Sequence, residues 1–164
     1  MSFQEYVLDR VTYVPPGGGE RVWAFSGDQY TIKGGVSDTG PGLGVAEAVI
    51  PPLSGPPLHV HHREDEAFYV LDGRLEVAEG ERTLVAEAGS FVFTPRGTPH
   101  RFRNVGSDAC RMLLLFAPAG FERFFAEVGV AVVDDQPPPS PEQYPQDVAR
   151  AMEIAAEKYG IEPA

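Results

Sequence analysis

The chain has 164 residues and a formal net charge of −11. This length is typical of one domain with a hydrophobic core large enough to be stable alone. The negative charge would repel a phosphate backbone, so we expect no nucleic-acid partner. No apolar run reaches the roughly 20 residues that a membrane-spanning helix needs, so we expect no membrane partner. The N-terminal residues lack the basic start and apolar segment of a secretory signal, and we predict a cytoplasmic protein.

Glycine and proline are abundant, with 18 and 16 residues, and cysteine occurs once, at Cys110. The first two favour short strands joined by tight turns, and a single cysteine excludes an internal disulfide. Turn residues recur at the spacing of an all-β sandwich or barrel. The expected strands, in chain order, are residues 6–14, 21–25, 28–33, 43–50, 58–62, 66–71, 74–78, 83–86, 91–94, 99–104 and 110–117.

Two connections between these strands carry specific expectations. Residues 34–44 contain five glycines and a proline, so we predict a loop there. Asp72-Gly73 separates two apolar runs, and glycine accepts a positive φ angle without strain. This pair therefore predicts a β-hairpin turn, and Glu79-Gly80 predicts a second turn.

The pattern changes after Pro118, where apolar residues recur at helical spacing. We predict one short helix at 120–128 and another at 141–159, the second starting after Ser140 and stopping at Gly160. The predicted organisation is a β-barrel with an N-terminal strand at 1–118, whose core is roughly 43–117. A C-terminal helical extension packed on the barrel follows at 119–164.

Three of the four histidines lie within one short stretch, and the fourth is His100. Because side chains alternate along a strand, His59 and His61 should share a face while His62 points away. Glu66 can fold back beside the pair if it begins the next strand of a hairpin, and His100 can add a fourth ligand from a later strand. Imidazole and carboxylate groups suit a divalent transition metal, and manganese, iron, cobalt, nickel and zinc all accept this set.

The spacing of these residues resembles the two sequence motifs of the cupin superfamily. The first is His59-x-His61-x4-Glu66-x6-Gly73, and the second is Gly89-x5-Pro95-x-Gly97-x2-His100-x3-Asn104. One departure is that Gly55 precedes the first histidine by four residues, whereas the family motif has five. The resemblance implies an all-β double-stranded β-helix (a cupin jelly-roll barrel) with the ligand side chains pointing inward.

A reading without a metal also has to be considered. Burying His59, His61 and Glu66 in an apolar barrel without an ion would leave costly polar groups. We therefore predict metal binding by these three residues and His100. Glu64 and Asp65 are expected in a solvated turn.

The residues in phase with the ligands are mostly apolar. Phe68 and Val70 follow Glu66 on its face, and Phe102 follows His100. Further apolar walls are offered by Phe91, Phe93, Met112, Leu114 and Phe116. No arginine or lysine is clearly in phase, so a planar or apolar organic substrate is favoured over a polyanion.

The histidine stretch and residues 118–125 are most similar to single-domain cupins related to quercetin 2,3-dioxygenase. That resemblance implies a dioxygenase that acts with O₂ on a small flavonol-like or enol substrate, with Glu66 as both ligand and catalytic proton acceptor. The alternatives are a metal-dependent isomerase, lyase or hydrolase on a small organic acid or sugar, and a non-catalytic small-molecule-binding cupin. Cupins of this size often pair, so we also expect a homodimer, with residues 6–14 crossing to the partner.

Overall fold

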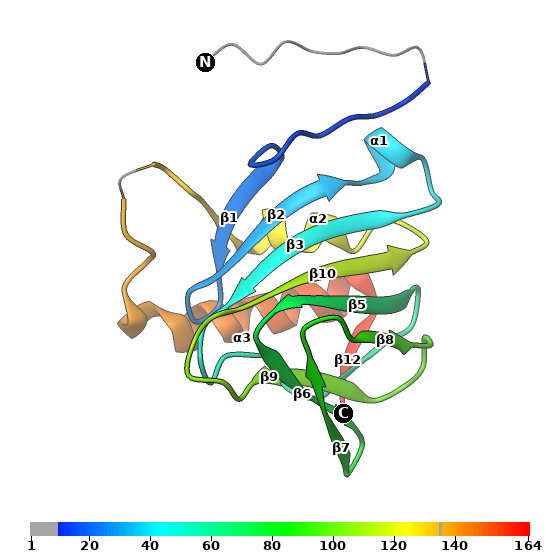
Figure 1. Ribbon diagram of the computed structural model, residues 1–164. Coiled ribbons are helices and arrows are strands. Elements are labelled where there is room, and N and C mark those ends of the chain that lie inside the picture. The colour runs from blue at the N-terminus through cyan, green and yellow to red at the C-terminus, as the bar shows by residue number, and fades with distance from the viewer. Residues whose placement is uncertain (1–9, 135) are drawn as a thin grey trace.

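Two antiparallel sheets face each other and enclose the core (Figure 1). The computed structural model describes residues 10–134 and 136–164. The larger sheet comprises β1 (Glu20–Ala24), β2 (Asp28–Gly34), β3 (Gly44–Ile50), β5 (Asp65–Asp72), β8 (Phe91–Thr94), β10 (Cys110–Ala117) and β11 (Val130–Ala131). The smaller comprises β4 (His59–His61), β6 (Arg74–Glu79), β7 (Arg82–Glu87), β9 (His100–Asn104) and β12 (Ile161–Pro163). Their spatial orders are β11-β1-β2-β3-β10-β5-β8 and β12-β4-β9-β6-β7.

The core lies between the sheets and follows the two-residue period of the strands. On β3 the side chains of Ala46, Ala48 and Ile50 are fully buried, and the residues between them are half-buried. The same alternation on β10 buries Met112, Leu114 and Phe116. Each large apolar side chain buried in this way contributes about 1.5–3 kcal/mol of transfer free energy. The predicted jelly-roll class and the predicted alternation on β3 are confirmed.

The predicted hairpin at Asp72-Gly73 is wrong. β5 pairs with β10 and β8, whereas β6 pairs with β7 and β9, so this turn carries the chain from one sheet to the other. Gly73 has a φ of +82°, and a Cβ there would lie 3.1 Å from Cys110 Cα. The local signal for a turn was right, but it could not say which strands would pair. Glu79-Gly80 does form a hairpin turn, with Glu79 opposite Arg82.

Two further expectations need correction. Residues 10–14 of the predicted N-terminal strand are not in a strand, and residues 6–9 lie outside the described part of the chain. The predicted loop at 34–44 contains one helical turn, α1 (Val36–Thr39). The buried Glu122 carboxylate accepts a hydrogen bond from Val36 N–H at 3.3 Å and another from Gly120 N–H at 2.6 Å, which ties this loop to the C-terminal segment.

The C-terminal segment forms helices that pack against the barrel and then a strand that joins it (Figure 1). The helical elements are α2 (Glu122–Val128), a 3₁₀ turn (Pro141–Gln143), α3 (Tyr144–Ile154) and a π-helical turn (Ala155–Tyr159). The predicted stop at Gly160 is confirmed, since this residue takes a left-handed conformation with φ of +68°. β12 then pairs with β4, so the chain end lies beside the histidine strand. None of the helices in the described ranges is long and apolar enough for a membrane span.

Candidate metal centre

Four side chains from three strands converge inside the barrel. His59 and His61 lie on β4, Glu66 on β5 and His100 on β9, and one ligand atom of each lies within 4.8 Å of the others. All four are buried. His62 points outward as strand alternation predicts, where its Nε2 lies 2.8 Å from Glu162 Oε2.

Glu66 reaches this cluster by a different route from the one predicted. It does not fold back in a hairpin with β4, because β4 and β5 belong to opposite sheets. Its carboxylate instead faces the histidines across the barrel interior, with Oε2 2.7 Å from His100 Nε2 and 3.4 Å from His61 Nε2. The site therefore depends on the packing of the two sheets against each other.

The outer ring nitrogens of the three histidines are held by fixed acceptors. His59 Nδ1 lies 2.8 Å from the carbonyl oxygen of Pro57, and His100 Nδ1 lies 2.8 Å from that of Thr98. A carbonyl oxygen can only accept, so each Nδ1 must carry the proton. His61 Nδ1 lies 2.5 Å from Glu64 Oε1, which favours the same tautomer. In the neutral form of each ring, which is the form that binds a metal, Nε2 then keeps a lone pair directed into the cluster.

This donor set fits a cation. The Nε2 atoms of His59 and His61 lie 3.1 Å apart, and with both Nδ1 atoms protonated two lone pairs face each other across that distance. The Glu66 carboxylate adds a negative charge to the same space. Three imidazole nitrogens and one carboxylate oxygen, each fixed by an outer hydrogen bond or by burial, form a coordination set for a divalent transition metal.

The ionisation of these groups follows from burial and from their mutual contacts. Burial lowers the pKa of His59 to about 4, although Glu66 opposes the shift, so this imidazole stays neutral near pH 7. Burial alone would raise the pKa of Glu66, but the hydrogen bond from His100 and the nearby histidine charges outweigh it and lower that pKa. Burial likewise lowers the pKa of His100, and the contact with Glu66 more than reverses this. In the metal-free protein a proton between His100 and Glu66 thus offsets the negative charge.

Glu64 is not in a solvated turn, which corrects the prediction for this residue. Its side chain is buried, and it accepts the hydrogen bond that orients His61. An outer carboxylate of this kind fixes the ring orientation and raises the basicity of the inner nitrogen. Asp65 does lie at the surface, where it pairs with Arg96 at 3.1 Å. Sequence spacing from the histidines could not separate these two neighbours, because their environments come from other strands.

The glycines of the two motifs bring distant backbone segments together at the site. Gly97 N–H donates to the carbonyl oxygen of His61 at 2.8 Å, which joins the second motif to the first. Gly55 has a φ of +157°, and a Cβ there would clash with the carbonyl oxygen of Phe102. The glycine is therefore required at its observed place, four residues before His59.

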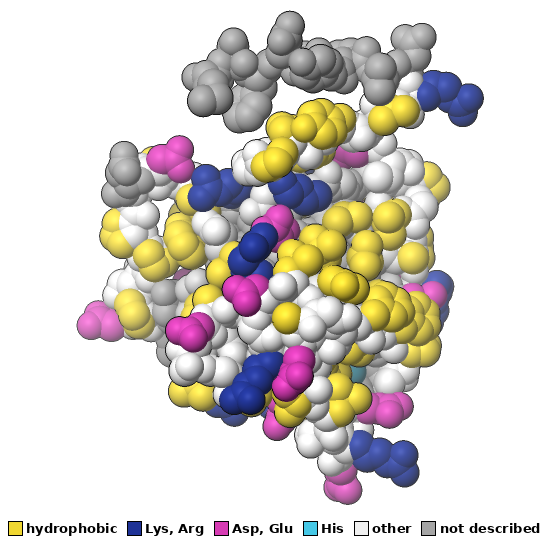
Figure 2. Space-filling model, in the orientation of Figure 1, with side chains coloured by type: hydrophobic (Ala, Val, Ile, Leu, Met, Phe, Trp, Pro, Cys, Tyr) yellow, Lys and Arg dark blue, Asp and Glu magenta, His cyan; other side chains and the backbone are white. Residues whose placement is uncertain are grey.

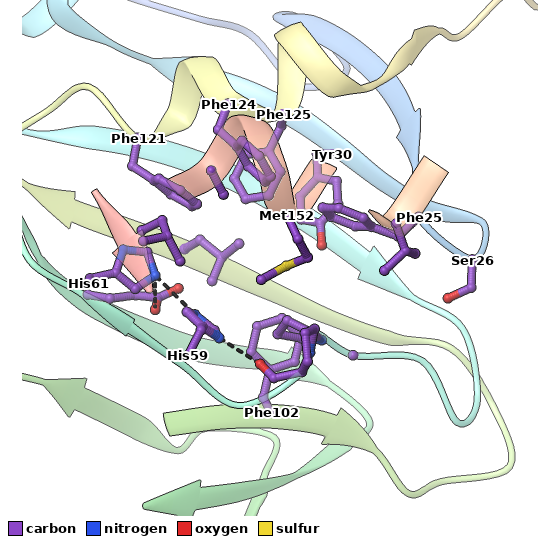
Figure 3. Close-up of a pocket in the computed structure, with 18 residues that line it drawn as sticks. Phe25, Ser26, Tyr30, His59, His61, Phe102, Phe121, Phe124, Phe125 and Met152 are labelled. Atoms are coloured by element: carbon purple, nitrogen blue, oxygen red, sulfur yellow. Dashed lines mark hydrogen bonds and ion pairs between the residues drawn. The ribbon is translucent and has the colours of Figure 1, made fainter. Parts of the chain in front are cut away.

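A pocket opens beside the histidines and is mostly apolar (Figure 3). The space between its lining atoms is about 700 Å³, and part of that space is open to solvent. None of the described residues that line it is lysine or arginine. The lining residues are Phe25, Ser26, Tyr30, Gly55, Pro56, Pro57, His59, His61, Glu66, Phe102, Leu114, Phe121, Phe124, Phe125, Val148, Met152, Ala155 and Ile161.

Only part of this wall was predicted. Phe102 and Leu114 line the pocket, as expected, and Phe68 packs edge-on behind Phe102 in the core. Phe91 and Phe93 do not, since both side chains are more than half exposed on the outer face of β8. Most of the missed wall residues come from the β1–β2 region, from α2 and the residue before it, and from α3; others lie in the loop before β4, in the π-helical turn and on β12. Their helical and strand periodicity marked them as apolar, but nothing local indicated that they face the histidines.

Comparison with known proteins agrees with this geometry. The Cupin domain family model matches residues 46–116, a segment that contains both motifs and all four clustered residues. The fold resembles that of KdgF from Halomonas sp., with a TM-score of 0.61 and 20% identity over 68% of this chain and 97% of that one. Residues 46–116 therefore match the Cupin domain family, and the fold of the chain resembles that of a solved cupin-like structure.

Two curated relatives match parts of the chain. An uncharacterized protein of Streptomyces coelicolor is 35% identical over 57 residues, which are 35% of this chain and 53% of that protein. Quercetin 2,3-dioxygenase of Bacillus subtilis is 48% identical over 48 residues, which are 29% of this chain and 14% of that enzyme. The chain thus spans about half of the first relative and about a seventh of the second.

Proposed function

We propose that this protein is a metal-dependent cupin dioxygenase that acts on a small flavonol-like or enol substrate. The observation that carries the proposal is the four-residue cluster at one end of an apolar, aromatic-walled pocket, with no lysine or arginine among the described residues that line it. A planar, uncharged substrate suits such a wall. The partial match to quercetin 2,3-dioxygenase supports the same class of reaction.

Each protein group has a distinct role in this proposal. His59, His61, Glu66 and His100 would hold a manganese, iron, cobalt, nickel or zinc ion, and the ion would supply Lewis acidity and a place for O₂. Glu66 would also accept the proton of a substrate hydroxyl, because its lowered pKa keeps the carboxylate ionised and able to receive one. Phe121 and Phe102 would hold the substrate plane and exclude water from the cluster.

Metal content tests the ligand assignment. We expect His59→Ala and His100→Ala to lose most of the bound metal in elemental analysis of the purified protein. His62→Ala is the matched control, because His62 is adjacent in sequence but points to solvent, and it should keep the wild-type content. Equal metal content in all three variants would refute the assignment.

Oxygen uptake tests the reaction. Protein is reconstituted separately with each of the five metals; at least one of these forms should consume O₂ with quercetin, and His100→Ala loaded with the same metal should not. Turnover of a substrate without O₂ uptake would overturn the dioxygenase and indicate a metal-dependent isomerase, lyase or hydrolase. Ligand binding that survives metal removal, with no turnover of any kind, would indicate a non-catalytic binding cupin.

We also propose that two copies of the chain pair through the outer face of the larger sheet. Tyr69 on β5 and Phe91 on β8 are directly opposite each other, and Phe93 lies beside them. All three side chains are exposed, and Figure 2 shows hydrophobic side chains gathered over this region. An apolar face of this kind is typical of an interface. Sedimentation at micromolar concentration should give a dimer, and a single monomeric species would contradict the proposal.

A further inference from the structure

A polar group lies in the pocket at the end away from the histidines. Ser26 and Tyr30 line the pocket, and Figure 3 shows Ser26 opposite His61 across it. Behind them lie two buried polar residues, Asp28 and Ser54, which are 1% and 7% exposed. These four residues are here called the Asp28 network.

The hydrogen bonds of the Asp28 network all run toward the carboxylate. Tyr30 O–H donates to Asp28 Oδ2 at 3.1 Å, and Ser54 O–H donates to Asp28 Oδ1. A hydroxyl has one proton to donate, so Ser54 must accept in its 2.7 Å contact with Ser26. Ser26 therefore donates to Ser54, and every hydroxyl proton in the network is used internally.

The direction of these hydrogen bonds decides whether the pocket offers donors or acceptors to a ligand. The oxygens of Ser26 and Tyr30 keep only lone pairs for anything that enters, so both act as acceptors. They match a group that donates a hydrogen bond, such as a phenolic hydroxyl. A carboxylate does not fit, because it has no proton to donate, and both a carboxylate and a phosphate would face the buried negative charge of Asp28.

The backbone at this end is held in an unusual conformation. Phe25, a lining residue, has a φ of +52°, which is rare for a residue with a side chain. Its ring meets those of Tyr30 and Phe124 at centroid distances of 6.0 Å. Such a conformation is strained and is maintained only where the surroundings require it. Here it sets the β1–β2 turn and thereby places Ser26 at the rim of the pocket.

We propose that Ser26 and Tyr30 form a subsite that accepts a hydrogen bond from the hydroxyl of a neutral phenolic ligand. The ring of that ligand lies among the phenylalanines, and its other end points to the histidine cluster. The assignment of this ligand as substrate rests on the proposed function, whereas the recognition of the hydroxyl does not require a metal.

Two small probes of nearly equal shape test the subsite. p-Cresol carries a hydroxyl that can donate, and 4-methylanisole carries a methoxy group that cannot. Calorimetric titration of metal-stripped wild-type protein should show p-cresol binding tighter by about five-fold, the value expected for one net hydrogen bond. Ser26→Ala and Tyr30→Phe should each reduce this preference, and the double variant should abolish it.

The controls separate a lost subsite from a misfolded protein. Ser37→Ala removes an exposed hydroxyl outside the pocket and should keep the full preference. Near-ultraviolet circular dichroism checks the packing of each variant, and Ser26→Ala is the decisive one because Ser26 is itself exposed. Equal binding of the two probes to wild type, no binding of either at millimolar concentration, or a preference unchanged in the folded Ser26→Ala and Tyr30→Phe variants would overturn the proposal.

Failure of the proposed reaction gives a different result. If reconstituted protein consumes no O₂ with quercetin but still prefers p-cresol through Ser26 and Tyr30, the subsite stands and the dioxygenase does not. If O₂ uptake is found and the probe preference is absent, the reaction stands and the subsite is refuted.

Discussion

The buried carboxyl of Asp28 gives the metal-free protein a pH dependence that can be calculated. Burial raises the pKa of Asp28 from 3.8 to about 6, and the hydrogen bonds from Ser54 and Tyr30 only partly oppose the shift. The native state therefore binds a proton more tightly than the unfolded state does. This proton stabilises the native state fully at pH values below the pKa of Asp28 in the unfolded chain. The stabilisation is lost as the pH rises through about 6, the pKa of Asp28 in the native state.

The size of the effect follows from the two pKa values. A shift of about two units corresponds to roughly 3 kcal/mol between the fully protonated and fully ionised limits. Between pH 5 and pH 8, linkage gives Asp28 a loss of about 1.4 kcal/mol of unfolding free energy. The asparagine in Asp28→Asn cannot titrate. Between pH 5 and pH 8 the unfolding free energy of this variant should therefore fall by about 1.4 kcal/mol less than that of the wild type.

Urea unfolding of the two proteins at several pH values measures this difference. Only the change with pH is compared, because the substitution also alters the baseline free energy of unfolding. The other titrating groups, including His59, are common to both proteins and cancel in the difference. Parallel pH profiles for wild type and Asp28→Asn would refute the argument, since they would mean that Asp28 has the same pKa in the folded and unfolded chains.

Two further predictions concern the metal centre and the core. Glu64→Gln should weaken metal binding about 10–100-fold in a chelator competition, because His61 loses its charged partner. The surface control Asp65→Asn should leave the metal affinity unchanged. Equal metal affinities of the two variants would contradict the orienting role of Glu64. Leu75→Ala should lower the unfolding free energy by about 2–5 kcal/mol, whereas Leu84→Ala, at a half-exposed position, should change it by about 0.5 kcal/mol or less. Comparable losses in urea unfolding would refute the assigned burial.

Local sequence was sufficient for most of the strands. The predicted bounds of β8 and β10 are those of the structure, and β3 differs by one residue. Strand alternation also separated His59 and His61 from His62, because a two-residue period is a property of the extended chain itself. The fixed spacing of the two motifs added Glu66 and His100.

Contacts between distant segments decided the rest. Asp72-Gly73 marks a turn, but only the packed barrel determines that this turn joins two sheets. Phe91 and Phe93 share a face, as alternation requires, yet that face is the outer one because they pair with Tyr69 and Ala67, which lie on the side of β5 away from the core. Alternation determines which side chains share a face of the strand, but it does not determine which of the two faces is buried.

The candidate site shows the same division. The sequence by itself predicted the histidines and Glu66 as ligands, from their chemistry and from the spacing within two motifs. Only the tertiary structure decided that Glu64 is buried against His61 and that Tyr30 and Met152 line the pocket. These residues lie on segments widely separated along the chain, and their proximity arises from packing two sheets and a terminal helix around one interior, which no local pattern encodes.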